Sequence, residues 1–149
     1  MFEKDLIVFS EEAFAKKDEV IEAMARLAVD KVTDVNTYAD AVRKREAAFC
    51  TYIDHEVAIP HGKTDAVKTP FVIYQRMAEG VIWGEEDERA RHVFMIGVPA
   101  AAAGNLHLKI LAELSKALIR DEFRTRLFDT ASEEEAFEVL KAIEEAIVL

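Results

Sequence analysis

The sequence predicts a single α/β domain over residues 1–149, in which a mixed β-sheet lies between helices, a three-layer α/β/α arrangement. Short apolar runs in the middle of the chain, each bounded by Pro, Gly or charged residues, are typical of strands buried on both faces. On either side of these runs, apolar residues recur at the 3.6-residue period of helices. The chain is 51% hydrophobic, which is enough to form one substantial core.

The first elements are expected in the order strand, helix, helix. Residues 6–9 form an apolar run that predicts a strand. Residues 18–30 predict a helix, because their apolar side chains share one face. A second helix is expected over residues 36–49.

The middle and the end of the chain supply the remaining elements. Four apolar runs predict strands: residues 57–59, 71–74, 81–83 and 93–96. After Pro99 the helical period returns, and one face carries His107, Leu111, Leu114 and Leu118. A last helix is expected from Ser132, which forms a capping-box pair with Glu135. Its inner face is Ala136, Val139, Leu140, Ile143 and Ile147.

Charge and composition exclude several classes of function. Nineteen basic and 29 acidic residues give a net charge of −10, which argues against a nucleic-acid partner because phosphate backbones require a basic face. The single cysteine, Cys50, rules out an internal disulfide and fits a reducing compartment. The first residues do not have the pattern of a signal peptide, and no apolar run is long enough to span a membrane. We therefore expect a cytoplasmic protein with no direct membrane insertion.

The segment Ile59-Pro60-His61-Gly62 is the strongest candidate for chemistry. Pro60 fixes its own φ, and Gly62 permits a backbone conformation that other residues avoid. These flanking residues predict a tight turn that holds the imidazole of His61 in a fixed orientation. A histidine that acts as a nucleophile needs such a fixed orientation.

The other histidines are weaker candidates. His107 stands at a predicted helix start, where the helix dipole attracts phosphate and disfavours protonated imidazole; the competing interpretation is a core histidine bonded to backbone. His92 is expected to be structural or at the surface, and His55 to be an exposed loop residue. Cys50 is expected to pack beneath this loop. Arg45 ends a helix, where an arginine commonly complements the helix C-terminus.

Three blocks of sequence carry a family resemblance. Arg45-Glu46 precedes a turn that contains Thr51, residues 57–62 read Val-Ala-Ile-Pro-His-Gly, and residues 107–115 read His-Leu-Lys-Ile-Leu-Ala-Glu-Leu-Ser. The arginine precedes the first histidine by 16 positions, and the second histidine follows it by 46. In order and spacing these blocks resemble the fructose/mannitol-type IIA (EIIA) family of the bacterial phosphoenolpyruvate-dependent sugar phosphotransferase system. Residues 121–124 and the capped last helix continue the likeness.

The resemblance implies a phosphotransferase component that serves sugar uptake. His61 would accept a phosphoryl group from the phosphohistidine of HPr or a related carrier and hand it to a cysteine of a IIB domain. His107 would donate a hydrogen bond to the phosphoryl oxygens, and Arg45 would neutralise their charge. A neutral imidazole is a good nucleophile at neutral pH. The implied mechanism uses no metal, nucleotide or other cofactor.

The sequence departs from the family in one place. Asp54 and Glu56 occupy positions at which members usually carry glycine. We expect these carboxylates, with the negative net charge, to form an acidic rim around an apolar docking patch near His61.

Two other functions stay open. The first is a regulatory module of the nitrogen type, with the same fold and phosphohistidine, whose phosphorylation state controls partner proteins. The second is a metal-dependent hydrolase that uses Asp54, His55, His61 and His107, which we disfavour because two histidines with five residues between them across a turn are not a familiar ligand spacing. The residues do not identify the sugar.

Overall fold

The computed structural model describes residues 1–85, 87–101 and 105–148. The elements are a 3₁₀ turn Lys4–Leu6, β1 Ile7–Ser10, α1 Lys17–Leu27, α2 Val35–Ala48, β2 Tyr52–Asp54, β3 Val57–Ala58, β4 His61–Thr64, β5 Phe71–Ile82, β6 Arg89–Pro99, α3 Leu106–Ile119, α4 Asp121–Phe128 and α5 Glu133–Val148.

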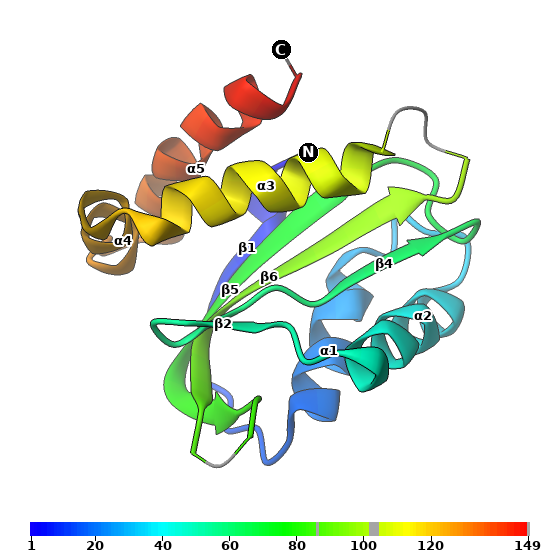
Figure 1. Cartoon of the computed structure of the whole chain (residues 1–149), viewed down its shortest axis with the longest axis horizontal. Helices are drawn as coiled ribbons and strands as arrows, with labels where there is room; N and C mark the ends of the chain where they lie inside the picture. The colour runs from blue at the N-terminus through cyan, green and yellow to red at the C-terminus, as the bar shows by residue number, and fades with distance from the viewer. Residues whose placement is uncertain (86, 102–104, 149) are drawn as a thin grey trace.

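The strands form one mixed sheet in the order β1-β5-β6-β3-β2, and β4 also pairs with β6. The β1–β5, β3–β6 and β4–β6 pairs are parallel, whereas β5–β6 and β2–β3 are antiparallel. Helices α3, α4 and α5 cover one face of the sheet, and α1 and α2 cover the other (Figure 1). The predicted three-layer α/β/α class is confirmed.

The two long central strands, β5 and β6, divide their side chains between the two helical layers. Phe71, Ile73 and Met77 pack in the cluster with α1 and α2, while Val72 and Tyr74 pack with α3, α4 and α5. This alternation follows from the two-residue period of a strand. The prediction that residues 71–74 and 93–96 are strands buried on both faces is confirmed.

The helices agree with the predicted pattern within a few residues. α1 ends at Leu27, three residues before the predicted end. α2 starts where the side chain of Asp34 accepts hydrogen bonds from the first turn. At α5, the Glu135 amide donates to Ser132 Oγ (3.2 Å), and the Glu135 carboxylate accepts from the Ala131 amide (2.9 Å).

Other elements differ from the prediction. Residues 81–83 are not a separate strand, because β5 continues to Ile82 after a register shift. β2, β4 and α4 were not predicted. The sequence of β4 is His-Gly-Lys-Thr, with no apolar alternation to reveal it, and α4 buries only Phe123 and Leu127.

Candidate functional site

His61 lies at a break between two short strands. Both β3 and β4 pair with β6, and Ile59 and Pro60 separate them. The Ile59 amide donates to the Thr51 carbonyl (3.0 Å), and proline has no amide hydrogen to donate. The structure therefore corrects the predicted tight turn: His61 is the first residue of β4, and the fixed orientation comes from the strand.

One hydrogen bond determines which nitrogen of His61 carries the proton. The Nδ1 atom is 2.9 Å from the carbonyl oxygen of Ile59. A carbonyl only accepts, so Nδ1 carries the hydrogen and the lone pair is on Nε2. Burial lowers the pKa of His61, and the charge of Arg45 lowers it further, against the opposing effect of the Ile59 hydrogen bond. The ring is thus held as a neutral nucleophile with a defined reactive nitrogen.

Gly62 is required for close packing rather than for an unusual turn. Its φ lies outside the left-handed region. A Cβ atom at this position would lie 3.1 Å from Cγ2 of Val42 and 3.3 Å from Cε1 of Tyr38, both on α2. The hydroxyl of Tyr38 also donates to the Ile96 carbonyl at 2.7 Å. The glycine therefore lets α2 approach β4 closely, which brings the end of α2 near His61.

Arg45, His61 and His107 line the same hollow, which has a volume of about 460 Å³. They come from the end of α2, the start of β4 and the start of α3. The rest of the lining is Ala41, Lys44, Gly62, Lys63, Leu108 and Leu111. The structure thus brings together all three residues that the sequence singled out.

Arg45 has capacity left for a ligand. Its Nη1 donates to the carbonyl of Phe49 at 2.9 Å, just past the end of α2. A guanidinium has five N–H donors, so this contact leaves four. The helix-end role that the sequence suggested is present, and it does not exhaust the side chain.

His107 is the second residue of α3 and is half-buried. Its Nδ1 atom is buried and has no hydrogen-bond partner among the described residues. Burial lowers the pKa of His107, and the nearby charge of Lys63 lowers it further. The ring is therefore neutral at neutral pH, and Nε2 is the nitrogen available to a ligand.

A buried network fixes the end of α2 that carries Arg45. The carboxylate of Glu46, only 5% exposed, accepts from the Thr51 amide (2.7 Å) and the Thr51 hydroxyl (2.5 Å). The indole of Trp83 donates to the same hydroxyl (3.3 Å), and Lys17 lies 3.5 Å from Glu46. Glu46 and Thr51 thus hold the chain that joins α2 to β2, which positions Arg45 at the hollow.

The charged residues that line this hollow are basic, and sequence reasoning missed two of them, Lys44 and Lys63. Asp54 lines a different hollow, between β2 and α3, and Glu56 lines another beside α4. The expected acidic rim is therefore wrong for the hollow around His61. Lys63 follows His61 by two residues, and the strand period could have placed both on one face had β4 been recognised.

The remaining candidates lie outside the hollow. His92 is structural, as expected: its Nδ1 atom lies 2.7 Å from the hydroxyl of Tyr74, and its ring stacks on Phe128. His55 is exposed, as expected, whereas Cys50 is exposed rather than packed beneath the loop. Within the described ranges, no three His, Cys, Asp or Glu side chains are grouped to hold a metal ion.

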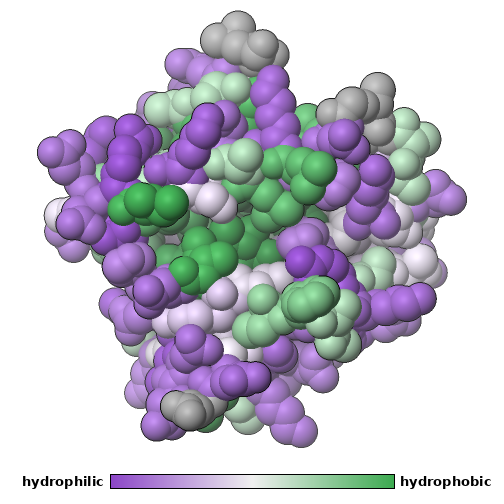
Figure 2. Space-filling model, in the orientation of Figure 1, coloured by the Kyte–Doolittle hydropathy of each residue, from purple (hydrophilic) through white to green (hydrophobic). Residues whose placement is uncertain are grey.

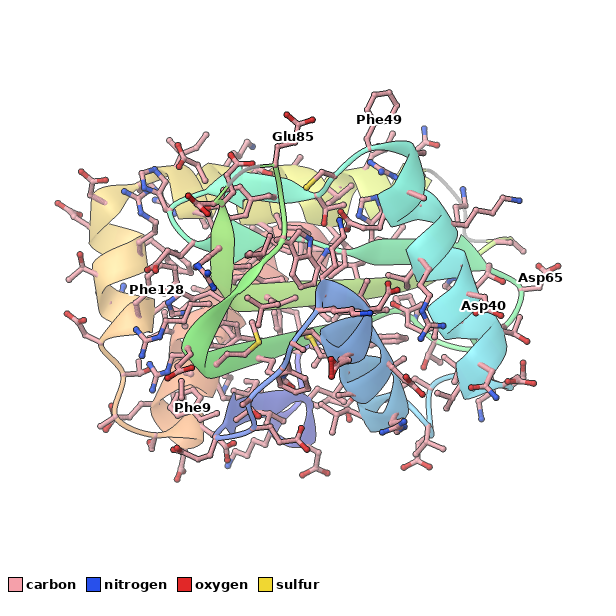
Figure 3. The ribbon with its side chains drawn as sticks, turned by 90° about the horizontal axis from the view of Figure 1, so that it is seen from below. Phe9, Asp40, Phe49, Asp65, Glu85 and Phe128 are labelled. Atoms are coloured by element: carbon pink, nitrogen blue, oxygen red, sulfur yellow. The ribbon has the colours of Figure 1, made fainter. Side chains whose placement is uncertain are left out.

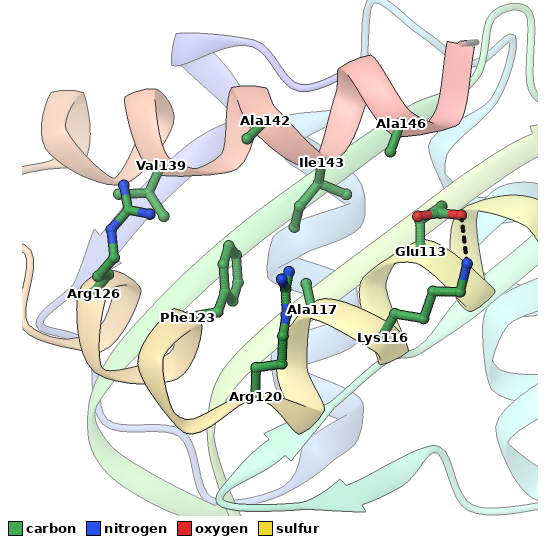
Figure 4. Close-up of a pocket in the computed structure, with 10 residues that line it drawn as sticks. All are labelled: Glu113, Lys116, Ala117, Arg120, Phe123, Arg126, Val139, Ala142, Ile143 and Ala146. Atoms are coloured by element: carbon green, nitrogen blue, oxygen red, sulfur yellow. Dashed lines mark hydrogen bonds and ion pairs between the residues drawn. The ribbon is translucent and has the colours of Figure 1, made fainter.

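A larger hollow, of about 550 Å³, lies between α5 and the α3–α4 pair (Figure 4). Its floor includes Phe123 and Ile143, and Arg120 and Arg126 lie on either side of Phe123. None of the predicted site residues lines it.

Among the described helices, none is long and apolar enough to cross a membrane.

A neutral, oriented imidazole in an open basic hollow, on a mixed sheet between two helical layers, is suited to carrying a phosphoryl group. The pattern of the family described as "Phosphoenolpyruvate-dependent sugar phosphotransferase system, EIIA 2" matches residues 1–143. The chain belongs to this EIIA family, and the resemblance seen in the sequence is confirmed.

Individual relatives agree with this assignment. The chain is 38% identical over 142 residues to the PTS system fructose-specific EIIA component of Haloferax volcanii, covering 93% of this chain and 92% of that protein. It is 31% identical to the fructose-specific EIIABC component of Bacillus subtilis, over 84% of this chain and 20% of that longer protein.

Solved structures share the fold. Enzyme IIA for mannitol of Escherichia coli, in a complex with phosphorylated enzyme IIB, superposes with a TM-score of 0.79 at 29% identity, over 95% of this chain and 99% of that one. The nitrogen regulatory protein IIA-Ntr of Neisseria meningitidis gives a TM-score of 0.84 at 23% identity, over 93% and 95%. At that identity the second likeness concerns the fold alone.

Proposed function

We propose that this protein accepts a phosphoryl group on Nε2 of His61 from the phosphohistidine of HPr or a related carrier, in the cytoplasm. It then passes the group to a cysteine of a IIB domain, for uptake of a sugar of the fructose/mannitol type. The observation that carries the proposal is the Nδ1 hydrogen bond to Ile59, which leaves the lone pair of a neutral imidazole on Nε2.

The chemistry is two successive displacements at phosphorus. The Nε2 lone pair of His61 forms a bond to phosphorus while the phosphorus–nitrogen bond of the donor breaks, and the donor imidazole leaves with those electrons. A thiolate of the IIB domain then attacks, and the imidazole of His61 leaves in turn. Both steps depend chiefly on the alignment of the attacking and leaving atoms and on neutralisation of the negative charge on the phosphoryl oxygens.

Arg45 and His107 are suited to that neutralisation. Arg45 has guanidinium hydrogens beyond the one that binds Phe49, and a planar guanidinium can contact two phosphoryl oxygens at once. His107 lacks a partner at Nδ1 among the described residues, so its proton can reside on Nε2 and be donated to a phosphoryl oxygen. Both residues line the hollow with His61.

An apolar surface beside the hollow is suited to partner docking. In Figure 2 a hydrophobic area crosses the middle of the face that presents α3 and β2. Ile53 and Ile119 are exposed at the hollow between β2 and α3, Leu108 is exposed at the hollow that holds His61, and Phe49 extends outward from the end of α2 (Figure 3). Exposed apolar area around a reactive group marks a protein-binding site. The mannitol relative was solved with its IIB partner, which supports the same role here.

The test is phosphorylation from phosphoenolpyruvate with enzyme I and HPr, followed by intact mass and acid lability. The wild-type protein should gain one acid-labile, alkali-stable phosphoryl group, and His61→Gln should gain none. His55→Gln is the matched control, because His55 is exposed and lies away from the hollow. Equal phosphorylation of wild type and His61→Gln would refute the assignment.

A second step tests the acceptor. The phosphorylated protein is mixed with IIB domains, fructose-type first because the Haloferax volcanii relative is named for fructose. Transfer to a IIB cysteine is the expected result. A stable phospho-His61 that no IIB domain discharges would instead favour the regulatory alternative.

A further inference from the structure

Lys63 lies on the same face of β4 as His61. The two residues are separated by Gly62, whose position faces Tyr38 and Val42 on α2. Because side chains alternate along a strand, His61 and Lys63 both project away from α2, toward the α3 layer. Both line the hollow that His107 closes from the other side.

The charge of Lys63 is not used elsewhere in the described part of the chain. Lysines at positions 4, 17, 31, 116 and 141 form ion pairs, but no carboxylate among the described residues lies within ion-pair distance of Lys63. Lys44 of the same hollow likewise forms no ion pair with the described residues, but Lys63 is the lysine that shares a strand face with His61. Lys63 and His107 line the same hollow, and the charge of Lys63 adds to the effect of burial in lowering the pKa of His107.

The geometry points to Lys63 as a phosphoryl-binding residue that stabilises the phosphorylated form of His61. This inference rests on the proposed function. A phosphoryl group carries about two negative charges, and Arg45 supplies one permanent positive charge. Lys63 supplies a further charge from the same strand face as His61, whereas Arg45 and Lys44, the other basic side chains of the hollow, come from α2.

Lys63 also adds to the effect of burial, which is the main reason that the pKa of His107 is lowered. A protonated His107 would add positive charge, but it would also repel Lys63 and Arg45 when no phosphate is bound. His107 then remains a neutral hydrogen-bond donor in the hollow.

The experiment compares Lys63→Gln, Lys63→Arg and a control, Lys68→Gln, which removes the same charge outside the hollow. Phosphorylated HPr is mixed with each protein, and the equilibrium constant for phosphoryl exchange is measured by ³¹P NMR. Loss of one charge-assisted contact should lower that constant for Lys63→Gln by about tenfold. Lys63→Arg should restore most of it, and Lys68→Gln should match wild type.

Two further readouts separate binding from folding and from the proposed function. Proton NMR of the histidine rings should show the His107 pKa raised in Lys63→Gln, with an unchanged melting temperature. Titration with inorganic phosphate should perturb the rings of His61 and His107 at higher phosphate concentrations in Lys63→Gln than in wild type.

Each outcome has one meaning. If wild type is phosphorylated and Lys63→Gln exchanges with the wild-type constant, the inference about Lys63 is overturned while the proposed function stands. If wild type takes no phosphoryl group, the proposed function fails, and the phosphate titration alone decides whether Lys63 binds phosphate. A His107 pKa that Lys63→Gln leaves unchanged would also count against the inference.

Discussion

Replacing Glu56 with glycine should stabilise the fold, because the backbone at this position suits glycine. Asp54, His55 and Glu56 are three consecutive residues with positive φ, at 104°, 54° and 64°. The conformation of Glu56 is imposed from outside: its carbonyl accepts from the amides of Arg91 (2.8 Å) and His92 (3.0 Å), and its amide donates to the hydroxyl of Tyr52 (3.2 Å). These bonds join main-chain atoms of residue 56 to its neighbours, so glycine keeps them.

The expected gain is the difference between two opposing effects. A side chain in the left-handed region costs about 1–2 kcal/mol, which glycine removes. Glycine in turn loses more conformational freedom on folding, by roughly 0.5–1 kcal/mol. The exposed carboxylate of Glu56 makes no side-chain hydrogen bond or ion pair to the described residues, so little else is lost. Relief of strain exceeds the entropy loss, and the free energy of unfolding should rise by about 0.5–1 kcal/mol.

The assay is urea unfolding followed by circular dichroism, with thermal melts as a second measurement. The melting temperature of Glu56→Gly should rise by about 2–4 °C per kcal/mol. Glu56→Ala is the matched control, because alanine removes the same carboxylate and keeps the strain; its stability should stay within about 0.5 kcal/mol of wild type. A glycine variant no more stable than the alanine variant would refute the reasoning.

Three other substitutions give separate tests. His107→Ala should slow phosphotransfer about 10²–10³-fold in stopped-flow exchange, with little change in melting temperature because His107 is half-buried at the first turn of α3; unchanged transfer would leave it only a structural role. Burial lowers the pKa of His92 to about 3 from 6.5, so the unfolded state binds the proton more tightly. The stabilisation that neutral, buried His92 gives the fold is complete above pH 6.5, and the free energy of unfolding should fall by roughly 3 kcal/mol on acidification to pH 4. His92→Gln should weaken this pH dependence in urea titrations, and an equally steep dependence would contradict the assignment. Gly62→Ala should lower the free energy of unfolding by about 1–3 kcal/mol and slow transfer, since α2 must move away from β4; wild-type values in both measurements would show that the contact yields freely.

The central strands and the helical layers could be predicted because each of their sequence patterns is complete within one segment. Strands 71–74 and 93–96 are continuous apolar runs, and the last helix has both a cap and an inner apolar face, so each feature is readable in one segment. β4 could not be found in this way. Its four residues form a strand because β6 supplies partners from His61↔Ile96 to Thr64↔Pro99, and that partner is distant in the sequence.

The candidate site divides in the same way. Order and spacing identified Arg45, His61 and His107, and the structure places them around one hollow. The presence of Lys44 and Lys63 in the hollow was not predicted, because the overall composition indicated only a negative chain. The reason for a glycine at position 62 was also predicted wrongly. Only the packing of α2 against β4 in the structure shows that the absence of a Cβ atom is what this position requires.

The interruption of the strand at Pro60 has a consequence for how such a protein can change partners. The carbonyl of Ile59 is a main-chain atom, and it selects which nitrogen of His61 stays unprotonated. A carboxylate in its place would be lost by a single substitution, and its charge would favour the imidazolium form. A peptide oxygen has neither weakness. Under the proposed function, side chains outside the hollow can therefore change to suit new donors and acceptors, while the main chain keeps Nε2 as the reactive nitrogen of His61.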